Sequence, residues 1–331
     1  MTRWISHSEA SVLLDCQAKH DFSYVDQLAG SSLKPKTKHL RLREGKAWGR
    51  AMAVYHERFG ALAAHYAIDT SLGEDAAEMI LEPEDLEETR VKLHALLDSY
   101  AADAEPLGVD QTELELDVQI PARSGKRAST LYRFTGFIDA IKQEPKGDWL
   151  VEFKLRGQLS SLEQVAFMRQ IRWYAWGHQQ QTGRPVAGVI VEERLNQEPK
   201  PARILANGLP SHATNQITTP GLYAAACRDA GITPQEDTLV ALADRKWQAR
   251  HTIFLTRAEI EEAGKQLTSV ANLAGQFDSG LLYPTRNPSQ FRCPSCAYRD
   301  ICNTPSDADL VDALFDRVPA KKDRQEEVTP A

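Results

Sequence analysis

A run of strand-like segments in the middle of the chain constrains the fold most. Residues 113–120 and 131–141 alternate polar and apolar side chains, and residues 149–155 form a short apolar run. A helical pattern at 162–182 and an apolar segment at 186–191 follow. Alternation with a period of two predicts half-buried strands, and a continuous apolar run predicts a strand covered on both faces. This order of elements predicts a mixed α/β sheet with helices packed on it.

Helices are expected on either side of this segment. A serine cap, at Ser6 or Ser8, predicts a first helix that reaches Cys16. The basic, proline-containing stretch 34–43 predicts a loop, and 69–83 an acidic connector. Residues 44–66 predict one continuous helix whose apolar stripe contains Trp48, Met52, Tyr55, Phe59 and Leu62. The remaining expected elements are helices at 83–102, 218–230, 234–249 and 257–277 and a short strand at 252–255.

Composition limits the class of protein. The chain has no run of about 18 apolar residues and no cleavable apolar leader, so we expect no membrane contact. Its 5 cysteines, an odd number in a large chain, favour a reducing, cytoplasmic location over a disulfide framework. The phosphate-binding sequence G-x4-G-K-[S/T] is absent, so any helicase activity must come from a partner.

The net charge of −7 is unevenly distributed. Residues 30–58 contain eight lysines and arginines against two acids, whereas residues 69–117 contain sixteen acids against two basic residues. An acidic average therefore does not exclude nucleic acid as a partner. The basic stretch alone is also compatible with an ordinary solvated face.

One constellation of charged residues follows the predicted strands. Asp139 lies near the end of the strand at 131–141, and Glu152 and Lys154 project from one face of the next strand. Two carboxylates with one backbone carbonyl suit Mg²⁺ or Mn²⁺, and a nearby lysine can stabilise charge on a phosphate. Charges on an exposed strand face are the alternative, although an unpaired carboxylate among apolar residues is costly.

The following helix and an upstream histidine extend this set. Gln170 and Tyr174 lie four residues apart and so share a helix face, and Arg169 and Arg172 on the same helix are candidates for phosphate contacts. His56 is a candidate fourth metal ligand; a lone histidine in a helix also commonly has a structural role.

The cysteines form a second constellation. Cys293, Cys296 and Cys302 give the spacing C-x2-C-x5-C, and Cys16 lies far upstream. Four thiolates suit zinc or an iron–sulfur cluster, and three reduced cysteines without metal are the alternative. Cys227, in an alanine-rich segment, is more simply a small buried residue.

Together these residues resemble the PD-(D/E)XK nuclease superfamily, in particular its RecB-like branch of CRISPR-associated and phage exonucleases. The resemblance implies a restriction-endonuclease-like core in which His56, Asp139 and Glu152 bind a divalent cation, with the Phe153 carbonyl, and Lys154 is catalytic. It also implies that Gln170 and Tyr174 support Lys154 and the DNA strand. Ile138 stands where the family name places proline.

A subset of that branch binds a 4Fe–4S cluster, and the chain resembles it in Ser6-His7-Ser8 and in the cysteine spacing. This resemblance implies a structural cluster on Cys16, Cys293, Cys296 and Cys302, with zinc as the alternative. The insert at 196–250 is similar to phage members. The implied regions are a helical N-terminal part at 1–110, the nuclease core at 111–195, that insert, a C-terminal helix with the cysteines at 251–302, and a polar, flexible tail at 303–331.

We therefore expect a metal-dependent DNA exonuclease of phage-type recombination or DNA end processing. DNA ends, and a single-strand annealing protein, are the expected partners. One alternative is a non-catalytic DNA-binding or assembly subunit that keeps the fold; the intact Asp139, Glu152 and Lys154 argue against it. Another is a zinc-stabilised protein adaptor, against which the basic stretch at 30–58 argues.

Overall fold

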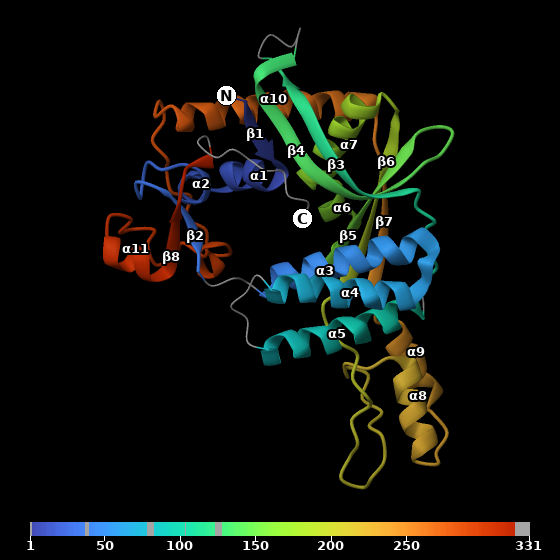
Figure 1. The fold of residues 1–331 in the computed structure, drawn as a ribbon. Coiled ribbons are helices and arrows are strands. Elements are labelled where there is room, and N and C mark those ends of the chain that lie inside the picture. Colours follow the sequence, from blue (N-terminus) through green and yellow to red (C-terminus); the bar gives the residue numbers. More distant parts are fainter. Residues whose placement is uncertain (1, 37–39, 78–82, 103, 123–127, 322–331) are drawn as a thin grey trace.

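The computed structural model describes residues 2–36, 40–77, 83–102, 104–122 and 128–321 (Figure 1). Its centre is a mixed sheet in the order β1-β4-β5-β6-β7, with β3 also paired to β4. The sheet comprises β1 (Arg3–Ser6), β3 (Gln111–Pro121), β4 (Ala128–Lys142), β5 (Asp148–Arg156), β6 (Val186–Leu195) and β7 (Gln248–Phe254). The pairs β1–β4 and β5–β6 are parallel and the others antiparallel. The predicted mixed α/β sheet is thus confirmed.

Strand β4 is shared between two neighbours along one edge. Antiparallel β3 occupies its other edge, while β1 pairs with residues 132–135 and β5 pairs only with residues 140–142. Between these two pairings, the stretch 136–139 has no strand on this edge among the described residues. Asp139 therefore lies where β5 separates from β4.

Helices cover both faces of the sheet (Figure 1). One face packs against α1 (His7–Asp15), α7 (Arg169–Thr182) and α10 (Arg257–Asp278). The other packs against α3 (Leu40–Val54), α4 (Gly60–Ala77) and α5 (Pro83–Ala101). Strand β5 serves both layers, because Leu150 belongs to the first core and Val151 and Phe153 belong to the second.

The single helix predicted at 44–66 is instead two helices. A π-helical turn, η1 (Tyr55–Phe59), contains Arg58 at φ 71° and precedes Gly60 at φ 86°, so the chain reverses and α4 packs beside α3. Phe59 and Leu62, expected in the buried stripe, are 68% and 84% exposed. The apolar stripe ends at this turn because α4 runs in a new direction and does not continue the buried face of α3.

Other boundaries also differ from prediction. The helix expected at 162–182 is divided into α6 (Leu162–Ala166) and α7, and the acidic connector is helical as far as Ala77. Part of the predicted loop at 34–43 belongs to β2 (Ser32–Pro35) and α3, while 37–39 and 78–82 lie outside the described residues. The insert contains α8 (Pro220–Asp229) and α9 (Glu236–Ala243), and α9 ends before 249 because β7 begins at Gln248.

The C-terminal segment is structured beyond residue 303. Helix α11 (Ala308–Leu314) and β8 (Phe315–Val318) follow the cysteines, and β8 pairs with β2. Val311 and Phe315 are buried in a small core with α2 (Gln17–Tyr24). The predicted flexible tail is therefore wrong for 308–318, and 322–331 lie outside the described residues.

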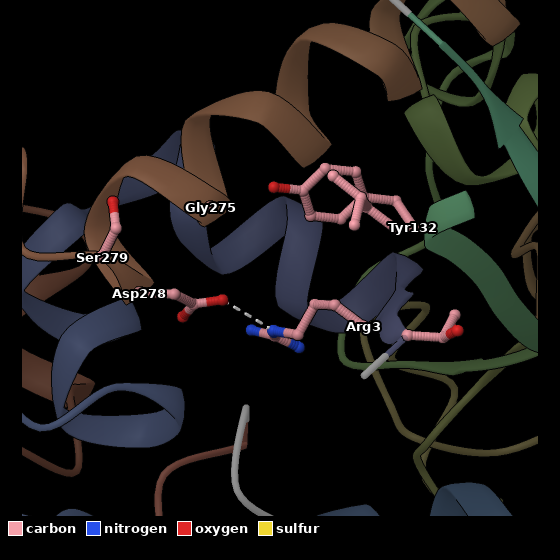
Figure 2. Close-up of a pocket in the computed structure, with 7 residues that line it drawn as sticks. Arg3, Tyr132, Gly275, Asp278 and Ser279 are labelled. Atoms are coloured by element: carbon pink, nitrogen blue, oxygen red, sulfur yellow. Dashed lines mark hydrogen bonds and ion pairs between the residues drawn. The ribbon is translucent and has the colours of Figure 1, made fainter. Parts of the chain in front are cut away.

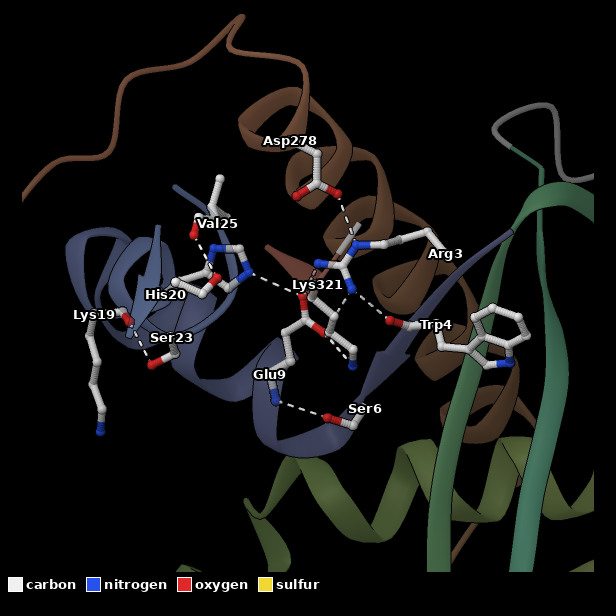
Figure 3. A network of polar contacts seen from close by, with 11 residues as sticks. Arg3, Trp4, Ser6, Glu9, Lys19, His20, Ser23, Val25, Asp278 and Lys321 are labelled. Carbon is white, nitrogen blue, oxygen red and sulfur yellow. Dashed lines mark hydrogen bonds and ion pairs between the residues drawn. The ribbon is translucent and has the colours of Figure 1, made fainter. Parts of the chain in front are cut away.

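A buried ionic cluster joins both ends of the described chain (Figure 3). Glu9 is fully buried and receives hydrogen bonds from Arg3 and, at 3.0 Å, from Lys321 Nζ, while its Oε1 lies 3.3 Å from His20 Nε2. Arg3 also binds Asp278 at the end of α10, with Nε 2.9 Å from Oδ2. This cluster fixes β1 and α1 against α2, α10 and the C-terminal segment.

A shallow pocket lies beside this cluster, between α10 and the adjoining strands β1 and β4 (Figure 2). Its lining includes Arg3, Tyr132, Gly275 and Asp278, and none of the carboxylates proposed from sequence. Gly275 is required here because a Cβ would collide with the Tyr132 hydroxyl. In the part of the chain that the structure describes, no helix is long and apolar enough to span a membrane.

Candidate active site

Asp139 marks the point where β4 and β5 separate. The last β4–β5 pair is Ala140 with Val151, and beyond it the Phe153 N–H donates to Asp139 Oδ2 at 2.8 Å. The carboxylate thus takes the hydrogen bond that continued strand pairing would have supplied. Because a side chain takes this hydrogen bond in place of the β4 backbone, the two strands stay apart. Asp139 then lies next to Glu152 in the gap between β4 and β5.

Glu152 and Lys154 project from β5 toward α7. The Lys154 Nζ donates to Glu152 Oε2 at 2.7 Å, and Gln170 Nε2 donates to the same oxygen at 2.8 Å. Glu152 is 1% exposed, and its buried Oε1 has no hydrogen-bond partner among the residues that the structure describes. Since a buried, unpartnered carboxylate oxygen is costly, Oε1 is suited to accept a cation.

The burial of this cluster changes its protonation. Burial raises the pKa of Glu152 to about 7; Lys154 opposes this rise and the neighbouring Asp139 carboxylate reinforces it. Burial also raises the pKa of Asp139. Burial opposes charge on Lys154, but the two carboxylates raise its pKa overall. The cluster therefore contains a charged lysine beside two carboxyl groups whose pKa values are raised. A bound cation would stabilise the ionised form of both carboxyl groups.

Tyr174 lies one turn after Gln170 on α7, as the four-residue spacing predicted. The ring passes so close to Gly136 of β4 that a Cβ there would lie 3.0 Å from the hydroxyl. Burial, followed by the charges of Glu152 and Asp139, raises the pKa of Tyr174. Tyr174 is therefore a neutral hydroxyl that can donate a hydrogen bond at the gap.

These residues fit a divalent cation by the chemistry of their donors, since carboxylates on adjacent strands are hard oxygen ligands. The Phe153 backbone lies between Glu152 and Lys154, and the role of its carbonyl as a third donor stays a prediction. Within the described ranges, no three His, Cys, Asp or Glu side chains already form a metal-binding group. The carboxylate pair thus needs at least one further donor.

His56 does not join this group. Its ring stacks on Phe153, with centroids 5.0 Å apart and planes 1° apart, whereas Glu152 projects from the opposite face of β5. Nδ1 accepts the Leu107 N–H at 3.0 Å, and Nε2 lies 3.0 Å from the Tyr100 hydroxyl. Both ring nitrogens are occupied on the far side of the sheet, so the predicted metal ligand is corrected to a structural histidine.

Replacing His56 by alanine is expected to reduce the free energy of unfolding by about 2–4 kcal/mol. The variant would lose the stacked ring and leave the buried Leu107 N–H without its acceptor. The affinity for Mn²⁺ is expected to stay unchanged. Urea unfolding and calorimetric Mn²⁺ titration measure the two effects; unchanged stability with lost Mn²⁺ binding would restore the ligand role.

The protonation of Glu152 predicts a pH-dependent stability. Its pKa of about 7 in the cation-free fold exceeds the ordinary value of 4.5, so its contribution to stability is complete below 4.5 and is lost as the pH rises through 7. In Glu152→Gln this loss is absent. Between pH 5 and pH 8, the stability difference should shift in favour of the variant by roughly 2–3 kcal/mol. Urea unfolding at both pH values with EDTA measures it, and a pH-independent difference would contradict the buried carboxyl.

The two predicted DNA-binding arginines differ in their surroundings. Arg172 is used within the fold, since its guanidinium binds the Ala166 carbonyl and lies 3.4 Å from Glu259. Arg169 is 46% exposed and lies 3.5 Å from Asp15. Arg169 therefore remains available to a ligand, whereas Arg172 fixes the break between α6 and α7.

His7, the first residue of α1, also lies at the site, although its sequence spacing gives it no role there. Its ring lies edge-on to Tyr174, with centroids 6.0 Å apart, and to Trp173. Burial lowers the pKa of His7 to about 4, and the charges of Lys154 and Arg169 lower it further. The Ser6-His7-Ser8 sequence was the available signal, since the Ser6 cap starts the helix beside the gap.

The four cysteines lie at the junction of α1, α2 and the C-terminal segment. Cys16 and Cys296 pack against one small core, and the thiol of Cys302, whose pKa burial raises, interacts electrostatically with both. Cys293 Sγ accepts the Ser289 N–H at 3.2 Å. All are free thiols, and Cys227 is buried elsewhere, as expected. Among the described residues, no group of three or more Cys, His, Asp or Glu side chains is placed to hold a metal ion.

Comparison with known proteins identifies the family. Residues 4–303 match the family described as the PD-(D/E)XK nuclease superfamily. No curated protein matches the sequence. Among solved structures, the chain is similar to one named "Putative exonuclease" from Eubacterium rectale, with TM-score 0.42, 10% identity and coverage of 84% of this chain and 86% of that chain. It is also similar to SSO0001, with TM-score 0.31, 14% identity and coverage of 78% and 85%. The family match spans nearly the whole chain and includes the gap with Asp139, Glu152 and Lys154, so the chain belongs to the PD-(D/E)XK nuclease superfamily.

Proposed function

We propose that this protein is a metal-dependent DNA exonuclease. The observation that carries the proposal is the buried group of Asp139, Glu152 and Lys154 at the separation of β4 and β5, where Glu152 Oε1 has no hydrogen-bond partner in the described part of the chain. A burial this costly is expected where a ligand completes the site. Membership of a nuclease superfamily supports hydrolysis of a phosphodiester as the reaction.

The residues divide the work as follows. Asp139 and Glu152 would hold the cation, with the Phe153 carbonyl as a third donor. A bound Mg²⁺ or Mn²⁺ supplies Lewis-acid charge for phosphodiester hydrolysis. Lys154, fixed by Glu152, would direct its charge toward a phosphate oxygen, and Gln170 holds Oε2 so that Oε1 stays free for the ion.

The test is digestion of end-labelled single- and double-stranded DNA with Mg²⁺, with Mn²⁺ and with EDTA. The proposal expects cation-dependent release of short products from DNA ends. Circular DNA without ends is the matched control and should persist. Cleavage of circular DNA would show that the protein is an endonuclease. DNA binding without cleavage would support the alternative of a non-catalytic DNA-binding subunit.

We further propose that the protein belongs to the RecB-like branch and carries a structural 4Fe–4S cluster on Cys16, Cys293, Cys296 and Cys302. The cysteine spacing supports this, as does the attachment of the Cys16 region to the C-terminal segment. Asn287 Nδ2 donates to the Asp15 carbonyl at 2.8 Å, and the Ala18 N–H donates to Thr285 at 3.0 Å. A cluster would strengthen this junction.

Anaerobic purification followed by visible spectroscopy and metal analysis tests the cluster. A brown protein with four irons per chain, whose broad absorbance bleaches on reduction, is expected. Cys302→Ser should lose the colour, whereas Cys227→Ser should keep it. Stoichiometric zinc in a colourless protein would identify the zinc alternative and overturn the cluster.

A role in phage-type recombination or DNA end processing, with a single-strand annealing protein as partner, completes the proposal. It rests on the resemblance of the 196–250 insert to phage members. Replacing residues 200–243 of that insert by a short linker, which keeps β7 in the sheet, should abolish co-purification with a single-strand annealing protein while leaving cleavage of free DNA intact. Unchanged co-purification would remove the insert from that role.

A further inference from the structure

Two strongly exposed phenylalanines are close in sequence to two arginines that share one carboxylate near the candidate active site. Phe167 is 83% exposed at the break between α6 and α7, and Phe291 is 82% exposed shortly before the first C-terminal cysteine. Arg169 follows Phe167 by two residues, and Arg292 follows Phe291 directly. We call these four residues the aromatic–arginine surface.

A single carboxylate brings the two halves of this surface together. Asp15 Oδ1 lies 3.5 Å from Arg169 Nη1 and 3.2 Å from Arg292 Nη1. Both guanidinium groups are about half exposed, with side-chain exposures of 46% and 53%. Since two positive charges share one negative charge, the surface keeps a positive excess that suits a phosphate chain.

The surface continues into the candidate active site. Arg169 is followed by Gln170, which binds Glu152, and the charge of Arg169 also acts on His7. His7 in turn contacts Tyr174 above Gly136. A strand held on the surface would therefore lie beside the gap that holds Asp139.

We propose that the aromatic–arginine surface binds single-stranded DNA by stacking bases on Phe167 and Phe291. This rests on the proposed nuclease function and defines its substrate as an unpaired strand. Exposed aromatic rings next to arginines are the combination that sequence-tolerant single-strand binding uses, because every base offers a π-face. In a duplex those faces are stacked on one another and are closed to the protein, so blunt duplex DNA should gain little from the rings.

The test is fluorescence anisotropy of labelled oligothymidylate with the full-length protein in EDTA, which separates binding from cleavage. Phe167→Ala and Phe291→Ala should each weaken binding by roughly 5- to 150-fold, the value of one stacked base. Phe167→Tyr keeps an aromatic ring and should bind oligothymidylate with the wild-type affinity. Phe59→Ala, at an exposed ring in the turn between α3 and α4 on the other face of the sheet, is the matched control and should bind normally.

If both variants bind oligothymidylate within about twofold of the wild type, the proposed stacking role is contradicted. It is also contradicted if the variants lose as much affinity for a blunt duplex as for the single strand. Because the measurement needs no cleavage, its failure is distinguishable from failure of the proposed function. A protein that cleaves DNA but shows no effect of Phe167 and Phe291 loses only the stacking surface. If the protein never cleaves DNA but the Phe167 and Phe291 variants bind oligothymidylate more weakly, the stacking surface is supported and only the nuclease function fails.

Discussion

Replacing Lys154 by methionine is expected to lower the rate of DNA cleavage by roughly 100- to 1000-fold, as for the loss of a positioned charge that stabilises a reacting oxygen. Methionine keeps the apolar stem of the lysine but removes the ammonium that lies 2.7 Å from Glu152. The loss should appear in the single-turnover rate at saturating DNA. It should not appear in DNA affinity, because Lys154 is 22% exposed and most of its charge is directed at the carboxylates.

Lys142→Met is the matched control for this experiment. Lys142 lies at the end of β4, with Nζ 3.6 Å from the exposed Glu144, and is a surface residue. The control should cleave at the wild-type rate. A Lys154→Met protein within about twofold of that rate would show that the lysine plays no part in the reaction.

The second large effect is expected at Glu9, remote from the chemistry. Glu9→Gln should lower the free energy of unfolding by about 3–5 kcal/mol, because it leaves the charges of Arg3 and Lys321 buried without their shared carboxylate. Although burial opposes the charge on Glu9, its partners hold its pKa far below the ordinary range. Its contribution is thus present above the ordinary pKa of 4.5 and is lost only as the pH falls through that depressed value.

Urea unfolding of Glu9→Gln beside Glu87→Gln tests this effect. Glu87 forms an exposed pair with Arg90, and such pairs contribute at most about 1 kcal/mol. The Glu87 variant should therefore unfold close to the wild type. Equal, small effects in both variants would show that the buried cluster in Figure 3 does not hold the chain ends together.

The core of the candidate site could be predicted because local patterns determine it. Alternation along 131–141 and the short apolar run at 149–155 placed Asp139, Glu152 and Lys154 on neighbouring strands, and a four-residue helical spacing placed Gln170 and Tyr174 on one face. The structure brings these residues together at the separation of β4 and β5. A short sequence pattern was sufficient because the position of a residue along a strand or helix determines the face from which its side chain projects.

The remaining features depend on contacts between distant segments. The sequence pattern places His56 within one continuous helix, whereas α3 ends at Val54 and the His56 ring, in the π-helical turn that follows, stacks on Phe153. No periodicity encodes such a turn. Likewise β8 is a strand because residues 32–35 pair with it, which a polar C-terminal composition does not reveal.

Asp139 and Glu152 are proposed to hold the cation of a nuclease, and a paired measurement on Glu152→Gln tests this role. Calorimetric Mn²⁺ titration and DNA digestion are carried out on the same folded preparation. The wild type should bind Mn²⁺ and cleave, while the variant loses both without unfolding, since glutamine is isosteric but a poor cation ligand. A Glu152→Gln protein that binds Mn²⁺ normally and cleaves DNA at the wild-type rate would contradict the claim.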